Sequence, residues 1–180
     1  MTDEQVLADT RHWIETAVIG LNLCPFARSV YLNKQVRMVV SQARNLDGFL
    51  DDLDRELDLL VNTPAEEIDT SLLVHPTLFP DFFVFNDFQN VVDEVLIEHD
   101  LDGVIQVASF HPLFQFEGSE ADDVTNATNR SPYAMLHLLR EDSVERAVAA
   151  YGDTDAIVEG NLKTLQALGA DGLKTLLTKP

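Results

Sequence analysis

Apolar residues recur along this chain with two different periods, which predict helices and strands in alternation. Apolar side chains at every third or fourth position, typical of amphipathic helices, occupy residues 3–19, 46–61 and 81–100. Short, largely apolar segments, typical of buried strands, occupy residues 35–42, 71–75 and 103–110. The first 110 residues therefore predict the order helix, strand, helix, strand, helix, strand.

This alternation predicts one α/β domain spanning residues 1–180. We expect a three-layer fold with a small, mainly parallel sheet, whose strands are joined by right-handed helical crossovers. An α+β fold with an antiparallel edge strand is the alternative, because the pattern shows only three strands. A chain of 180 residues is long enough to bury a sizeable core, and we find no internal repeat or linker that would divide it.

The periodicity is lost after His111. Residues 113–131 form a long polar loop, and loops of this length in compact domains are often lids or binding loops. Ser131 followed by Pro132 is typical of an N-cap and a first helical residue. We therefore expect a helix from Ser131 to about Tyr151, and a last helix over about residues 153–168.

The charge balance restricts the partners of this domain. Twelve Lys and Arg against 31 Asp and Glu give a formal net charge of −19. Such a field repels nucleic acids and anionic membranes, and an anionic ligand would need a local basic pocket. The N-terminus lacks the pattern of a signal peptide and no apolar run is long enough to cross a bilayer, so we expect a cytoplasmic protein. The pattern does not predict an oligomeric state.

Two predicted strands end in the same dipeptide, with His75 and His111 each followed by proline. Two parallel strands would place both histidines at the carboxyl edge of one sheet, where open α/β sheets bind ligands. The imidazoles would then act as acid/base groups or metal ligands, with Cys24 or an acid such as Asp122 as a third ligand for zinc or iron. The alternative is that each histidine caps the end of its own strand.

Cys24 is the only cysteine, so neither an intrachain disulfide nor dithiol chemistry is possible. It lies just before Pro25, with Arg28 nearby, and a short helix beginning there would favour a thiolate nucleophile or metal ligand. The alternative is a small buried residue between Leu23 and Phe26, which is a common environment for a free cysteine.

The segment around Ser131 is the most basic part of an acidic chain. The N-terminal amides of the expected helix, together with Arg130, would bind an anion. Helical spacing would place Tyr133, His137 and Arg140 on one face beside these amides. The alternative is a capped helix whose polar face is simply hydrated. A phosphate-binding P-loop is excluded, because the glycines and the lysine of that motif are missing.

Three motifs together resemble a known family. They are the segment 18–27 (VIGLNLCPFA), the two His-Pro strand ends and the segment 129–133 (NRSPY). Over about Trp13 to Glu145 the chain resembles an uncharacterised bacterial family, catalogued as domain of unknown function fourteen-fifteen. The resemblance implies a bacterial cytosolic protein and brings no established activity.

Two hypotheses about function follow from these residues. The first is an enzyme acting on a small anionic metabolite through His75, His111, Cys24 and a carboxylate, with or without a divalent metal. The second is a non-catalytic domain with an acidic surface that binds a ligand or a partner protein. Thiol chemistry at Cys24 without metal would require a histidine within hydrogen-bond reach of the sulfur. Close packing of these groups would favour catalysis, and separation would favour binding.

Overall fold

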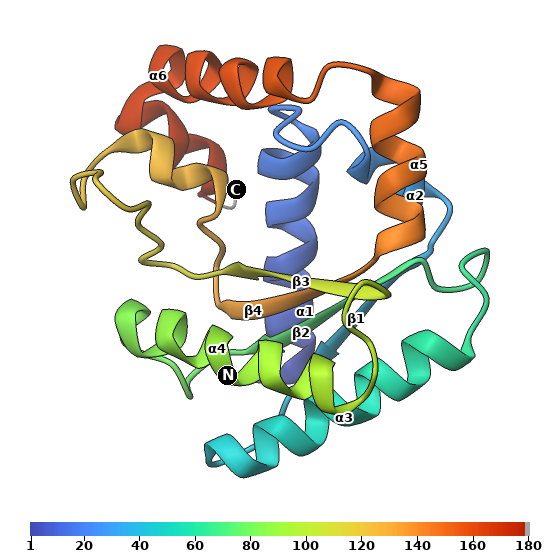
Figure 1. Cartoon of the computed structure of the whole chain (residues 1–180). Coiled ribbons are helices and arrows are strands. Elements are labelled where there is room, and N and C mark those ends of the chain that lie inside the picture. Colours follow the sequence, from blue (N-terminus) through green and yellow to red (C-terminus); the bar gives the residue numbers. More distant parts are fainter. Residues whose placement is uncertain (179–180) are drawn as a thin grey trace.

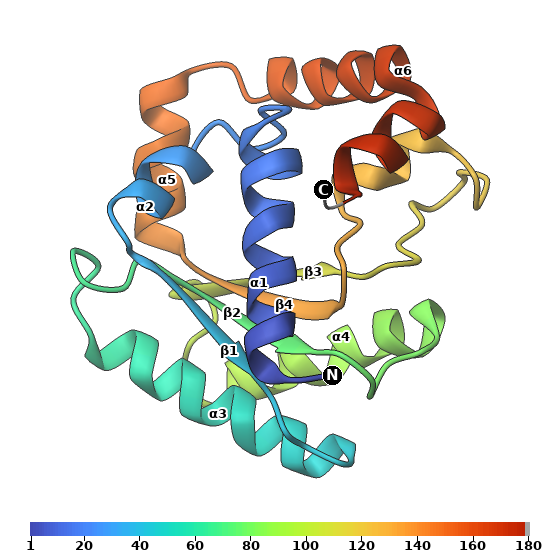
Figure 2. The same cartoon turned by 180° about the vertical axis from the view of Figure 1, so that it is seen from behind.

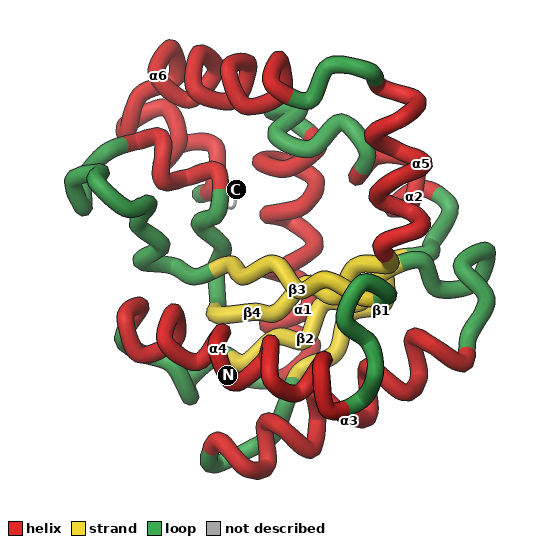
Figure 3. The backbone as a smooth tube through the Cα atoms, in the orientation of Figure 1, coloured by secondary structure: helices red, strands yellow, loops and turns green. Residues whose placement is uncertain are grey.

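A computed structural model describes residues 1–178, and it contains a four-stranded sheet surrounded by helices (Figures 1 and 3). The α-helices are α1 (Asp3–Trp13), α2 (Ala27–Leu32), α3 (Leu46–Asn62), α4 (Phe82–Glu98), α5 (Glu141–Tyr151) and α6 (Asp155–Leu177). A π-helix, η1 (Ile14–Ile19), continues α1, and a short 3-10 helix, η2 (Val124–Thr128), lies in the loop before the last strand. The strands are β1 (Val36–Val40), β2 (Thr70–His75), β3 (Ile105–Phe110) and β4 (Ala134–Arg140).

The elements predicted before residue 110 are confirmed, and local chemistry explains their limits. Helix α3 begins after Asn45, whose side-chain oxygen accepts a hydrogen bond from the amide of Gly48 at 2.9 Å. Helix α4 begins after Asp81, whose carboxylate accepts from the amide of Phe83 at 2.8 Å. Both caps satisfy amides that have no partner inside the helix.

The sheet is mixed, so the expectation of a mainly parallel sheet was wrong. The strand order is β1-β2-β4-β3; β1 and β2 are parallel, and β4 is antiparallel to both of its neighbours. The antiparallel strand therefore lies inside the sheet, whereas the alternative placed it at an edge. The chain leaves β3 and enters β4 at the same edge of the sheet, and without a crossover to the opposite edge the new strand must run antiparallel.

The prediction of a helix from Ser131 was also wrong over its first half. Ala134–Arg140 forms β4, and α5 begins only at Glu141. The hydroxyl of Ser131 donates to the carbonyl of Tyr133 at 2.6 Å and does not cap a helix. A short apolar run buried on both sides has no clear period, so spacing alone does not separate strand from helix. The final helix also extends further than expected, to Leu177, with a kink at Gly169.

Helices cover both faces of the sheet (Figures 1 and 2). Helices α3 and α4 pack on one face, where Leu73, Leu136 and Leu138 of the strands meet Phe49 and Phe85. On the other face the strands pack against α1, η1 and α2. Residues alternate between the two faces along each strand, as the pleat requires. Within the described residues, no helix combines the length and apolar content needed to cross a bilayer.

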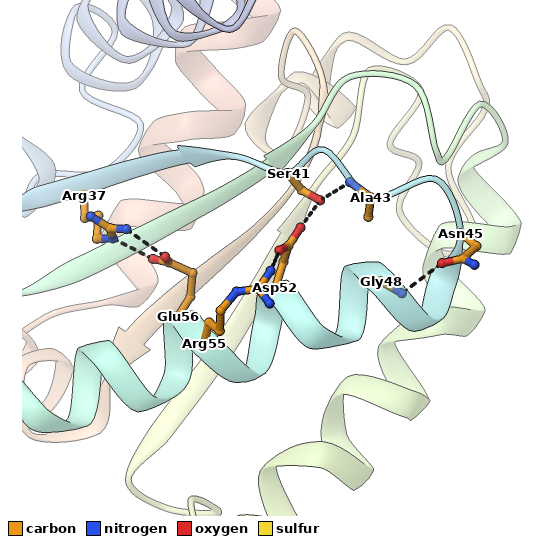
Figure 4. Close-up of polar contacts among 8 residues, drawn as sticks. All are labelled: Arg37, Ser41, Ala43, Asn45, Gly48, Asp52, Arg55 and Glu56. Atoms are coloured by element: carbon orange, nitrogen blue, oxygen red, sulfur yellow. Dashed lines mark hydrogen bonds and ion pairs between the residues drawn. The ribbon is translucent and has the colours of Figure 1, made fainter.

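One carboxylate is buried between α3 and the sheet (Figure 4). Glu56 is 5% exposed and accepts two hydrogen bonds from Arg37 of β1, at 2.8 and 2.9 Å. It also accepts one from the hydroxyl of Ser71 of β2, at 2.7 Å. This carboxylate therefore ties α3 to two neighbouring strands.

Candidate functional site

A cavity of about 630 Å³ lies between the sheet and the helices on its α1 side, and we call it the sheet cavity. Strand residues on one side include Val36, Leu72, Phe110, His137 and Leu139. Helix and loop residues on the other side include Trp13, Ile14, Val18, Cys24, Val30, Val144 and Ala147. A volume of this size and a mostly apolar lining with a few polar groups are typical of small-molecule sites.

The π-helix η1 shapes one wall of the sheet cavity. Ile14 and Val18 line the cavity, and the helix ends at Ile19, the last residue of the predicted helix, with Gly20 as its C-cap. A Cβ atom at Gly20 would lie 2.2 Å from the carbonyl oxygen of Thr16, so no larger residue fits this wide turn. Single π-helical turns within α-helices are frequent at functional sites.

Cys24 lies in the turn that follows this π-helix. The amide of Leu23 donates to the carbonyl of Val18 at 2.9 Å, which folds the turn back onto the end of η1. Cys24 is a partly exposed free thiol that lines the sheet cavity, and the helix expected after it forms at Ala27. The sequence therefore identified a cavity residue, although it did not identify the cavity.

His137 lies on β4 with its ring on the cavity side, at 6.1 Å from the ring of Phe110. Its cross-strand neighbours are Leu72 and Ala108, so its surroundings are apolar. The side chain is accessible through the cavity but surrounded by protein, and this burial lowers its pKa to about 4. Within residues 1–178, neither ring nitrogen has a hydrogen-bond partner. The cavity thus contains a neutral imidazole that can donate and accept.

The charged groups beside the sheet cavity are already paired within the protein. The Arg140 guanidinium donates to the carbonyls of Thr63 at 2.6 Å and Ile68 at 3.0 Å, near the end of α3. The carboxylate of Asp69 accepts from the hydroxyl of Ser143 at 2.5 Å. The Arg140 side chain therefore stabilises the fold and is not free to bind an anion. It lies on the sheet face opposite to the side chain of His137.

His75 and His111 lie at the same edge of the sheet, as the sequence predicted, but β4 runs between their strands. Two strand spacings separate their backbones by roughly 10 Å. Each ring is buried and bonded to backbone on both sides. His75 accepts from the amide of Leu78 and contacts the carbonyl of Ala43, both at 2.8 Å.

His111 repeats this arrangement at the end of β3. Its Nδ1 accepts from the amide of Leu113 at 3.0 Å, and its Nε2 lies 2.9 Å from the carbonyl oxygen of Phe79. An accepting Nδ1 and a donating Nε2 describe a neutral ring with both nitrogens in use. These contacts favour the alternative in which the histidines cap their strand ends.

The residues expected to hold a metal are not brought together. Cys24 lies on the cavity side of the sheet, whereas His75 and His111 contact phenylalanines on the α3 and α4 side. Asp122 is exposed in the loop before β4. In the part of the chain that the structure describes, no three His, Cys, Asp or Glu side chains gather as a metal site.

The other residues expected to bind an anion lie near a second cavity, of about 410 Å³, lined by Arg130 and Ser131. Arg130 donates to the carbonyls of Phe114 at 3.0 Å and Ala121 at 2.6 Å, and so braces the long loop. The helix amides on which the anion site depended are absent from this segment, because it leads into a strand. Tyr133 donates its hydroxyl proton to Asp9 of α1.

The stability of the protein is expected to fall in mild acid through His137. The unfolded imidazole binds a proton near pH 6.5, whereas the folded ring stays neutral down to about pH 4. Between these values the unfolded state binds more protons, so the free energy of unfolding rises with pH and the stabilisation is lost as the pH falls below 6.5. Between pH 7 and 4.5 the wild type should lose about 2 kcal/mol relative to His137→Phe in urea unfolding.

The control for this measurement is His99→Phe, since His99 is a partly exposed surface residue. This variant should keep the acid sensitivity of the wild type. Equal pH dependence in the wild type and in His137→Phe would show that the folded imidazole titrates normally.

The comparisons with known proteins agree with the sequence motifs. A family model described as Protein of unknown function (DUF1415) matches residues 5–175, which is nearly the whole chain. No curated protein and no solved structure matches the chain. The resemblance predicted from the motifs is confirmed at the level of the family, and the chain belongs to it.

Proposed function

We propose that this member of the DUF1415 family binds a small, largely apolar molecule in the sheet cavity. The observation that carries the proposal is a cavity of about 630 Å³ with an apolar lining and one unpartnered imidazole, His137. Apolar ligands gain binding energy from the surface that both partners remove from water. A few polar groups in such a pocket then set the orientation of the ligand.

Binding is favoured over catalysis because the candidate reactive groups are separated. The enzyme hypothesis required His75, His111 and Cys24 to act together, and both histidines already use their ring nitrogens for backbone contacts. Nucleophilic catalysis at Cys24 would need a base hydrogen-bonded to its sulfur. The alternative that the sequence left open, a ligand-binding domain, is therefore the function we propose.

The proposal is tested with the uncharged fluorescent dye N-phenyl-1-naphthylamine. Bound dye should emit strongly and accept energy from Trp13, which is the only tryptophan of the chain and lines the cavity. Ala147→Phe fills the cavity from α5 and should weaken dye binding at least tenfold. Ala149→Phe adds the same ring at an exposed position of the same helix and should leave binding unchanged.

Thermal unfolding of both variants establishes that they are folded before dye is added. If folded Ala147→Phe binds the dye as tightly as the wild type does, the dye site lies elsewhere and the proposal is wrong. If the wild type does not bind the dye at all, the cavity does not admit apolar molecules of this size and the proposal is also wrong.

A further inference from the structure

The position of His137 in the sheet cavity restricts the chemistry of the ligand. Its neighbours on β2 and β3 are Leu72 and Ala108, and Phe110 lies beside its ring. A ligand that fills the cavity removes the ring nitrogens of His137 from water, and a polar group buried without a hydrogen bond costs free energy. A ligand that supplies a hydrogen-bonding group at this point avoids that cost, whereas a wholly apolar ligand does not.

The charged groups around the cavity restrict the charge of the ligand. The guanidinium of Arg140 donates to backbone carbonyls, and the hydroxyl of Tyr31 donates to the carboxylate of Glu15 at 2.6 Å. Among the described residues that line the cavity, Arg140 is the only arginine or lysine, and its guanidinium is already bonded to the backbone. The formal charge of −19 on the whole chain opposes an anionic ligand further.

A cationic ligand is disfavoured at the imidazole itself. Asp69 is the carboxylate that lines this cavity, and it lies before the start of β2 and accepts from Ser143. His137 pairs with Leu72, which lies three residues after Asp69. A ligand group that faces the imidazole would therefore lie among apolar side chains. Moving a charge into such surroundings without a partner is costly.

We infer that the ligand of the sheet cavity is an uncharged molecule with an apolar body and one hydroxyl or similar neutral hydrogen-bonding group that faces the imidazole of His137. This inference rests on the proposed function, because it names the class of molecule that the same cavity takes. The neutral ring can accept the proton of the hydroxyl or donate its own to the oxygen. The depressed pKa of His137 keeps the ring uncharged at neutral pH and therefore suits a neutral ligand.

The test compares three molecules that share one apolar body: naphthalene, 1-naphthol and 1-naphthoate. Each displaces N-phenyl-1-naphthylamine from the wild type, from His137→Phe and from the surface control His99→Phe. In the wild type and the control, 1-naphthol should bind about tenfold more tightly than naphthalene, which is the effect of one good hydrogen bond. The anion 1-naphthoate should bind at least tenfold more weakly than 1-naphthol.

In His137→Phe, 1-naphthol and naphthalene should bind equally, because the ring that distinguishes them is gone. An advantage of 1-naphthol that persists in this variant would overturn the inference, and so would tighter binding of 1-naphthoate than of 1-naphthol. Both results leave the proposed function standing, since the cavity still binds apolar molecules. If none of the three displaces the dye from the wild type, the inference fails, whereas the proposed function is decided separately by dye binding to the wild type and to Ala147→Phe.

Discussion

Replacing His111 by alanine is expected to lower the free energy of unfolding by about 3 kcal/mol. The ring is 1% exposed, stacks on Phe85 at 5.4 Å and joins the ends of two loops through the amide of Leu113 and the carbonyl of Phe79. Alanine leaves a cavity beside Phe85 and two backbone groups without their partner. Urea unfolding of the variant and the wild type at pH 7 measures the difference.

His99→Ala is the control for this prediction. Its imidazole is a surface group 3.2 Å from Asp54, and exposed pairs of this kind contribute less than about 1 kcal/mol. A His111→Ala variant of unchanged stability would contradict the structural role. If such a variant instead lost a bound zinc or iron ion in elemental analysis, the original metal hypothesis would be supported.

Replacing Arg37 by methionine is expected to cost about 3 kcal/mol, because Glu56 would remain as a buried carboxylate without its cation. Arg37 donates hydrogen bonds to both carboxylate oxygens of Glu56 (Figure 4). The hydroxyl of Ser71 donates to only one of them. The double variant Arg37→Met/Glu56→Leu should recover a large part of this loss, since it removes the buried charge as well. The measurement is again urea unfolding at pH 7.

A second arginine provides the matched control. Arg55 also pairs with an acid of α3, Asp52, but its side chain is 68% exposed. Arg55→Met should therefore cost less than about 1 kcal/mol. Equal losses in Arg37→Met and Arg55→Met would mean that the burial of Glu56 does not decide the strength of its ion pair.

The local sequence pattern was sufficient to predict the first half of the fold, where hydrophobic periodicity and capping residues indicate the same elements. The helix predicted over residues 46–61 forms as α3, with an asparagine cap and a continuous apolar face toward the sheet. Residues 134–140 were different, because neither spacing nor the preceding Ser-Pro pair separated a strand from a helix. Only their pairing with β2 and β3 made them a strand.

The site depended still more on tertiary structure. The sequence identified Cys24 and His137 as candidates but linked them to different sites, and it gave no sign that Trp13, Val18 and Phe110 would line a cavity with them. An apolar residue on a cavity wall has the same local pattern as one in a filled core. Which of the two forms depends on how closely segments distant in the chain approach each other.

The sequence by itself determined the helices and strands of the first 110 residues and the common edge at which His75 and His111 lie, because these follow from local periodicity and from strand direction. Tertiary structure decided that β4 separates the two histidines and that their ring nitrogens form hydrogen bonds with backbone groups. It also left His137 without a partner in an apolar cavity. Hydrogen-bond partners are assigned only when distant segments meet, so the same residue types could become structural caps at one place and a candidate ligand contact at another.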